Sequence, residues 1–264
     1  MTITLNASQP DPRLRYTFGG DSGYETELHL TEALSALVPD SDLAHRDHRL
    51  FQLAHVMTEY AWVGIHDALC LLDAALAKDD LVDAGRTLAR ATSLAELPVS
   101  CLRLLTDALP QAVFLQMRGR FAQGATGLDS PGARSLRKAG AAVWERFEQT
   151  LTAHGVTLDD LVNATEPGYT GQTSRALLAD VMLHLQRLDT RILAWKQGHL
   201  TLVWQLLGGH PHATTEPDAA SADQPTSMRG RPITDLRRLA ARPLFPLLWQ
   251  RSSTVYHAAE TGYS

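Results

Sequence analysis

Two long stretches of the sequence keep a helical period of apolar residues, and they constrain the fold more than any other feature. The first covers residues 48–78, and the second covers residues 172–207. Apolar side chains recur in both at spacings of three and four, which is typical of an α-helix with one buried face. Because both exceed the usual length of a globular helix, they favour a helical bundle.

Shorter segments with the same period surround the two long ones. They cover residues 26–37, 81–94, 98–109, 111–123, 133–154, 158–163 and 233–251, the last broken near Pro243 and Pro246. Alanine, leucine and arginine are frequent and β-branched residues sparse, a composition that favours helix over strand. Hydrophobic residues make up 44% of the chain, enough to bury a substantial core. We therefore predict an all-α protein with a single domain over residues 1–264.

Two segments lack this periodicity. Residues 1–25 mix Pro, Gly, Asp and Ser, and we expect them to form an extended N-terminal arm rather than a packed element. Residues 208–232 are polar and contain few large apolar side chains, so they are expected to be a flexible loop. The position of this loop directly after the second long helix makes it a candidate lid.

Composition excludes several classes of function. A formal net charge of -5 disfavours a nucleic acid partner. The sequence has no uninterrupted apolar run of membrane-spanning length and begins without a signal peptide pattern, so we expect a cytoplasmic protein with no membrane partner. Cys70 and Cys101 lie in apolar runs without metal-ligand spacing, which predicts two buried, reduced thiols.

His199 is the titratable group on an otherwise apolar helix face. The face consists of Ile192, Trp195, His199, Leu202 and Leu206 at helical spacing. A single imidazole on an apolar wall can ligate heme iron while the wall packs against the macrocycle. A hydrogen-bonded core histidine is the commoner outcome of such a pattern, so spacing alone leaves both interpretations open.

His55 shows a parallel pattern on the first long helix. It shares a face with Phe51, Thr58 and Trp62, which would give an aromatic wall one group able to exchange protons. A structural role is again the alternative, because histidine is frequent in this region of the chain.

Arg118 is a candidate for binding a carboxylate. It follows an apolar helical turn and precedes Gly119, and a guanidinium can hold a carboxylate with two parallel hydrogen bonds. A solvated surface arginine is the alternative interpretation, and Arg120 is a competing choice. His210 and His212 lie in a polar loop and form only a weak metal-binding pattern.

Four segments together resemble the tryptophan 2,3-dioxygenase family. RDHRLFQLAHVMTEYAW, residues 46–62, is similar to the family's stretch in which Leu-Phe precedes a histidine and a glutamate follows. VFLQMRG resembles its Phe-x-x-Phe-Arg element, AWKQGHLTLVWQLLG its Trp-x-x-x-His ligand helix, and LFPLLWQRSS its Phe-Pro-Glu-Leu run. The order of the segments also agrees, over residues 28–252.

The resemblance implies a fold, a cofactor and a set of site residues. The fold is a helical bundle of the tryptophan 2,3-dioxygenase type that assembles as a homo-oligomer, a dimer or a tetramer. The cofactor is heme b, with His199 as axial iron ligand, Trp195 beside the cofactor and His55 as the catalytic group on the opposite side. The residues implied to bind the substrate are Tyr24, Phe51, Phe114 and Arg118.

The sequence also departs from the family pattern. Met117 replaces a phenylalanine, Phe114 stands where tyrosine is usual, and Leu28 occupies the place of a second N-terminal tyrosine. The Gly-Thr-Gly-Gly loop expected after the ligand helix is replaced by residues 211–232. These departures favour a divergent member of the histidine-ligated, heme-dependent aromatic oxygenases.

The expected reaction is oxygen insertion into the indole ring of tryptophan or a substituted tryptophan, with O2 as oxidant, in secondary metabolism. One alternative is an L-tyrosine hydroxylase of a natural-product pathway that uses O2 or peroxide. Another, from a different class, is a helical binding or scaffold protein whose histidines are structural.

Overall fold

The chain forms two compact units. The computed structural model describes residues 2–20, 22–121, 127–165, 169–210, 226 and 233–262. Unit 1 consists of Met1–Leu53 and Leu109–Ala122, and unit 2 consists of Ala54–Ala108 and Gln123–Ser264. The described residues are mostly helical, which confirms the all-α prediction at the level of fold class.

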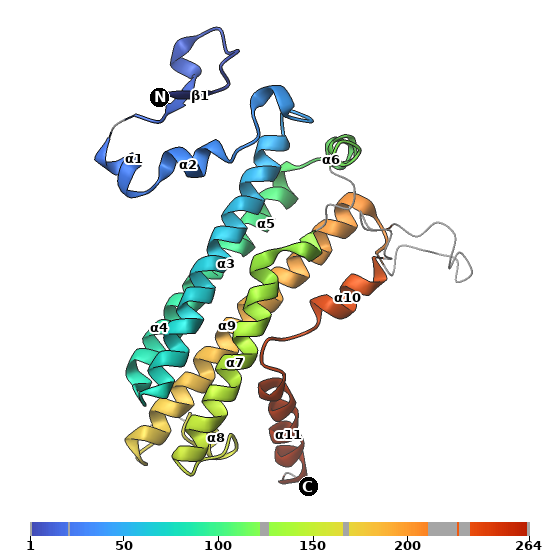
Figure 1. Ribbon diagram of the computed structural model, residues 1–264. Helices are drawn as coiled ribbons and strands as arrows, with labels where there is room; N and C mark the ends of the chain where they lie inside the picture. The colour runs from blue at the N-terminus through green and yellow to red at the C-terminus, as the bar shows by residue number, and fades with distance from the viewer. Residues whose placement is uncertain are drawn as a thin grey trace, which may run out of the picture. The chain divides into compact units, whose positions relative to one another are not determined.

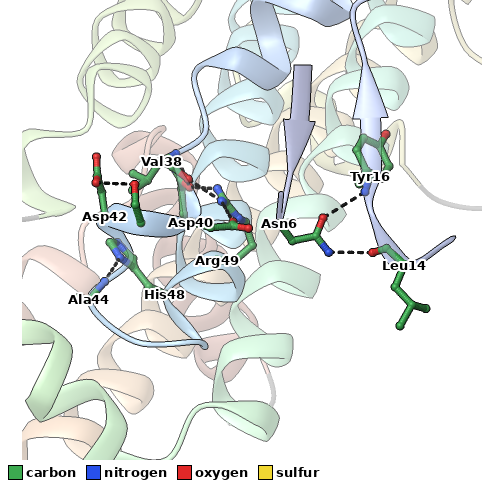
Figure 2. A network of polar contacts seen from close by, with 11 residues as sticks. Asn6, Leu14, Tyr16, Val38, Asp40, Asp42, Ala44, His48 and Arg49 are labelled. Carbon is green, nitrogen blue, oxygen red and sulfur yellow. Dashed lines mark hydrogen bonds and ion pairs between the residues drawn. The ribbon is translucent and has the colours of Figure 1, made fainter. Parts of the chain in front are cut away.

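Unit 1 begins with a small β-hairpin. Strand β1 (Ile3–Leu5) pairs antiparallel with β2 (Tyr16–Phe18), and the 3-10 helix η1 (Pro12–Leu14) lies between them. Asn6, in the left-handed region at φ 48°, closes the loop: its Nδ2 donates to the carbonyl of Leu14 at 2.8 Å, and its Oδ1 accepts from the Tyr16 N–H at 3.1 Å (Figure 2). The extended arm expected over residues 1–25 thus contains a small hairpin, which side-chain hydrogen bonds order locally.

The rest of unit 1 is made of short helices. These are α1 (Gly23–Glu27), α2 (Leu30–Ser35), the 3-10 helix η2 (Asp40–Asp42), the first turns of α3 (His48–Ala77), and α6 (Gln111–Arg118). The helix predicted over residues 26–37 is divided at His29, whose φ is 50°. The helix predicted over residues 111–123 ends early, at Arg118.

Arg49 ties the connection before α3 to the helix itself. Its guanidinium donates to the carbonyl of Val38 and to Asp40 Oδ1, the latter at 3.0 Å (Figure 2). His48 Nδ1 accepts the backbone N–H of Ala44 at 3.1 Å, and burial, followed by the charge of Arg49, lowers the pKa of His48. These bonds give partners to the carbonyl of Val38 and the N–H of Ala44, two backbone groups of the connection that precedes the helix.

Unit 2 is a bundle built around the longest helix, α9 (Thr173–Leu207). α9 contacts α4 (Leu81–Leu94), α5 (Glu96–Ala108), α8 (Asp160–Asn163) and α10 (Thr234–Ala240) (Figure 1). The other elements of the unit are most of α3, η3 (Gly127–Asp129), α7 (Pro131–Ala153) and α11 (Pro246–Gly262). The gap between α10 and α11 contains Pro243, as the sequence predicted.

The core of unit 2 is apolar and continuous. Its largest fully buried side chains include Trp62 of α3, Phe147 of α7 and Phe245 before α11. Burying each such side chain stabilises the fold by about 1.5–3 kcal/mol. By length and composition α3 could cross a membrane, a test that core helices of soluble proteins also pass.

Two expectations about single segments have different outcomes. The prediction of two buried thiols is half wrong, because Cys101 is buried but Cys70 is exposed. The residues around Cys70 are mostly apolar, but Cys70 itself lies on an exposed face of α3. Of the candidate lid at 208–232, residues 211–225 and 227–232 lie outside the described residues.

Candidate functional site

A cavity of about 880 Å³ opens inside unit 2, within the size range of small-molecule and cofactor sites. It lies between α3, α5, α7, α9, α10 and the segment that joins α10 to α11. Most of its wall is apolar. The lining side chains include Ala54, Trp62, Cys101, Leu102, Leu105, Leu136, Trp144, Ile192, Trp195, Leu200, Leu236 and Leu239.

Two histidines reach this cavity from different helices. His55 comes from α3 and His199 from α9, and both line the wall. Burial, and after it the proximity of His55, lower the pKa of His199 to about 4. At neutral pH the His199 imidazole is therefore uncharged and keeps a lone pair, the form in which histidine ligates a metal.

Trp195 packs against the ring of His199. The two rings are stacked, with centroids 5.7 Å apart and an interplanar angle of 29°. Trp62 then meets Trp195 edge-on, at 4.9 Å and 86°. The contact between the two indoles joins α9 to α3, and stacking on Trp195 favours the orientation that the His199 ring has here.

Three indole N–H groups of the cavity wall lack an acceptor among the described residues. They belong to Trp62, Trp144 and Trp195, whose Nε1 atoms are buried. A buried donor without a partner costs about 1–3 kcal/mol.

Gly127 of η3 lies beside the His199 ring. A methyl group placed on Gly127 would lie 3.8 Å from His199 Nε2. The η3 backbone thus borders the nitrogen that would bind a ligand, and a larger side chain here would narrow the access to it.

A basic wall forms another side of the cavity, and we use this name for Arg134, Arg137, Lys196 and Arg242. Burial lowers the pKa of Lys196, Asp189 acts in the opposite direction, and Arg137 and Arg242 lower it further. The Lys196 ammonium donates to the carbonyl of Arg242. The wall therefore gathers positive charge from α7, α9 and the segment before α11 at one place.

Glu59 supplies negative charge on the α3 side. Its Oε2 accepts the backbone N–H of Gly132 at 3.1 Å, and Gly132 lies in the first turn of α7, where the helix dipole favours an anion. Ser130 caps the same helix by accepting the N–H of Ala133 at 3.0 Å. Glu59 is thus engaged in holding α7 against α3.

The other predicted site residues belong to unit 1. Phe51 and Phe114 are 6.1 Å apart between ring centroids, and Phe51 stacks on Phe121 at 5.2 Å. Arg118 ends α6, one turn after Phe114, and is half-buried. Unit 1 therefore brings together an aromatic cluster and the predicted carboxylate-binding arginine.

Tyr24, by contrast, lies on α1 with 71% of its surface exposed. Its predicted role in substrate binding remains a prediction. His55, Trp195 and His199 are the predicted residues that the cavity of unit 2 brings together.

Sequence reasoning missed the basic wall. Lys196 stands three residues before His199, and Arg134 stands three before Arg137, so each pair shares one helix face. That spacing was visible in the sequence, but solvated faces of helices carry the same pattern. Arg242 and Trp144 gave no local signal, because tertiary packing alone brings them to the cavity.

The arrangement combines an apolar wall, one neutral imidazole suited to metal ligation, a second histidine and a basic side. Among the described residues, no three His, Cys, Asp or Glu side chains gather into a metal-binding group. A single imidazole is a sufficient protein ligand for iron that a macrocycle already holds. A scan against protein-family models and a search of curated proteins each found no match.

Proposed function

We propose that the protein is a heme b-dependent oxygenase that inserts oxygen into the indole ring of tryptophan or a substituted tryptophan, on a bundle of the tryptophan 2,3-dioxygenase type. The observation that carries this proposal is the cavity of unit 2, which His55 of α3 and His199 of α9 both line. The resemblance of four sequence segments to that family supports it.

The residues of the cavity fit a heme group in three respects. The wall around Trp195 and Leu102 can pack against an apolar macrocycle, and the stacked, uncharged His199 can donate its lone pair to iron. Basic side chains of the cavity wall can meet the two carboxylates of the macrocycle. When bound, heme supplies the iron at which O2 reacts.

The chain itself binds and orients the substrate, and it excludes water from the site. Trp195 holds the His199 ring in place, and the apolar wall keeps water from the reacting groups. His55 would accept a hydrogen bond from the indole N–H and so orient the substrate ring. In the proposal Arg118 binds the substrate carboxylate, and Phe51, Phe114 and Tyr24 contact the rest of the substrate, as the resemblance implies.

The first experiment is an optical spectrum of protein reconstituted with hemin, reduced, with and without carbon monoxide. We expect a Soret band that shifts on carbon monoxide binding and is lost or strongly perturbed in His199→Ala. His184→Ala is the matched control, because His184 lies on the same helix but pairs with Asp180 outside the cavity. The control should keep the wild-type spectrum.

A rescue experiment separates ligand loss from unfolding. Free imidazole added to His199→Gly should restore the spectrum if the missing group is an iron ligand. Circular dichroism should show the same helicity in the variants as in the wild type. Absence of heme binding in the folded wild-type protein would contradict the proposal and favour a binding or scaffold protein with structural histidines.

Product mass then tests the substrate and the reaction. With tryptophan and isotopically labelled O2, a dioxygenase incorporates both oxygen atoms and a monooxygenase one. A hydroxylated product from tyrosine, with tryptophan unchanged, would instead identify a tyrosine hydroxylase. Sedimentation of the holoprotein tests the homo-oligomer that the resemblance implies.

A further inference from the structure

The basic wall concentrates positive charge beside an otherwise mostly apolar cavity. Four cationic side chains from three segments line a mostly apolar cavity: Arg134 and Arg137 of α7, Lys196 of α9, and Arg242 before α11. Arg134, Arg137 and Arg242 are exposed and Lys196 is half-buried, so only Lys196 loses much of its hydration, while like charges placed together repel one another. The lowered pKa of Lys196, caused by burial and by Arg137 and Arg242, reflects both effects.

The carboxylates nearby are already engaged. Asp189 attracts Lys196, but its two oxygens accept hydrogen bonds from the N–H groups of Leu244, Phe245 and Trp249. Glu59 accepts the N–H of Gly132. Asp129 also lines the cavity and has a partner of its own, and its backbone carbonyl accepts a hydrogen bond from Arg134 Nη2 at 3.4 Å. Between described residues, no ion pair joins a carboxylate to a member of the basic wall.

We propose that the basic wall binds the carboxylate groups of the cavity's ligand, which under the proposed function are the two heme propionates. This inference rests on the proposed function and adds the residues that hold the anionic edge of the cofactor. Guanidinium groups bind carboxylates through paired, charge-assisted hydrogen bonds, and the low polarity of the remaining wall strengthens them.

The wall also sets the direction in which the ligand lies. Lys196 and His199 are three residues apart on α9, so they are one turn apart on the same face. A ligand whose carboxylates are held by the basic wall would be favoured in one orientation in the cavity. Without the wall, a flat apolar ligand could enter in either sense.

The test compares heme with its dimethyl ester, which has the same iron and ring but no carboxylate charge. Dissociation constants are measured by Soret titration of the heme-free protein. We expect the wild type to bind heme at least about tenfold more tightly than the ester, since charge-assisted hydrogen bonds are lost. Arg137→Gln and Arg242→Gln should weaken heme binding about five- to tenfold and leave ester binding within about twofold.

Arg187→Gln is the control, because Arg187 is an exposed arginine of α9 that does not line the cavity. It should change neither constant. Equal affinity of the wild type for heme and ester, or equal weakening of both by the two variants, would overturn the basic wall as a carboxylate site while the heme function stands. Failure of both porphyrins to bind would overturn the function and the inference together.

Discussion

The carboxylate of Asp189 accepts a hydrogen bond from the backbone N–H of Phe245 at 2.9 Å, although 56 positions separate the two residues in the chain. Asp189 is fully buried, and it also accepts the N–H of Leu244 at 2.8 Å and the indole N–H of Trp249 at 3.0 Å. One side chain of α9 therefore holds the segment that leads from α10 into α11. Because Leu244 also lines the cavity, the hydrogen bonds that Asp189 accepts help to shape the candidate site.

Replacement of Asp189 by alanine should destabilise unit 2. Three donors would lose their acceptor inside the core, and we expect the free energy of unfolding to fall by about 3 kcal/mol or more. Urea denaturation followed by circular dichroism measures the change. Asp180→Ala, which removes an exposed carboxylate of the same helix, is the control and should cost less than about 1 kcal/mol. Similar losses in the two variants would argue against this structural role of Asp189.

Gly132 is a position where α7 approaches α3 too closely for a side chain. A Cβ atom there would lie 2.5 Å from Trp62 Cβ, so Gly132→Ala should destabilise the protein by about 1–3 kcal/mol through overpacking. The control is Gly85→Ala in α4, where the added Cβ would meet Asp180 at an ordinary 3.5 Å. Helix propensity should make that variant neutral or slightly more stable. Thermal unfolding measures the stability of both variants, and a Gly132→Ala variant more stable than Gly85→Ala would contradict the prediction.

The pKa of His199 predicts a pH dependence for the heme-free protein. Its pKa is lowered to about 4 in the fold, from an ordinary value of 6.5, so the unfolded chain binds more protons between these two values. Stability from this group is complete above about pH 6.5 and is lost as the pH falls toward 4. Between pH 7 and 5 the wild type should therefore lose about 1–2 kcal/mol more than His199→Gln. Urea denaturation of both proteins at the two pH values measures these losses, and equal losses in the wild type and the variant would contradict an uncharged His199 imidazole in the fold.

Under the proposed function, Arg118 and Arg120 provide a matched pair of variants for testing which arginine binds the substrate carboxylate. Arg118 is half-buried at the end of α6, whereas Arg120 is exposed. We expect Arg118→Leu to weaken tryptophan binding to the holoprotein at least about tenfold, by loss of charge-assisted hydrogen bonds. Arg120→Leu should change it less than about twofold. Binding is followed through the perturbation of the heme spectrum, and the opposite ranking would assign the role to Arg120.

The two cysteines should differ in their reaction with a thiol reagent. Cys70 is exposed on α3, whereas Cys101 is buried in the cavity wall. In the native protein Cys70 should react rapidly, and Cys101 should react only after denaturation, because access limits the reaction. Cys70→Ser should abolish the fast phase. A fast phase that persists in this variant would show that the cavity admits the reagent.

The helices of unit 2 could largely be predicted from local signals. The helix predicted over residues 81–94 has the bounds Leu81–Leu94 in the structure, and it begins after Asp80, whose side chain accepts the N–H of Asp83. The helix predicted over residues 48–78 ends at Ala77. Apolar periodicity and capping residues are local properties, so one sequence is enough to place such boundaries.

The N-terminal hairpin could not be predicted in this way. It depends on Asn6 reaching Leu14 and Tyr16 across a loop, and strands of three residues carry too little periodicity to be recognised. The exposure of Cys70 likewise depends on which face of α3 meets its neighbours. Such facts follow from pairing and packing between segments, not from the period of any one segment.

The sequence by itself determined the helical class, the long helices that carry His55 and His199, and the apolar face on which His199 lies, because each is written in the spacing of nearby residues. Only the tertiary structure decided that both imidazoles line one cavity, and that Arg137, Lys196 and Arg242 meet there. These residues come from helices and links far apart in the chain, and the packing of the bundle core alone fixes which of their faces converge.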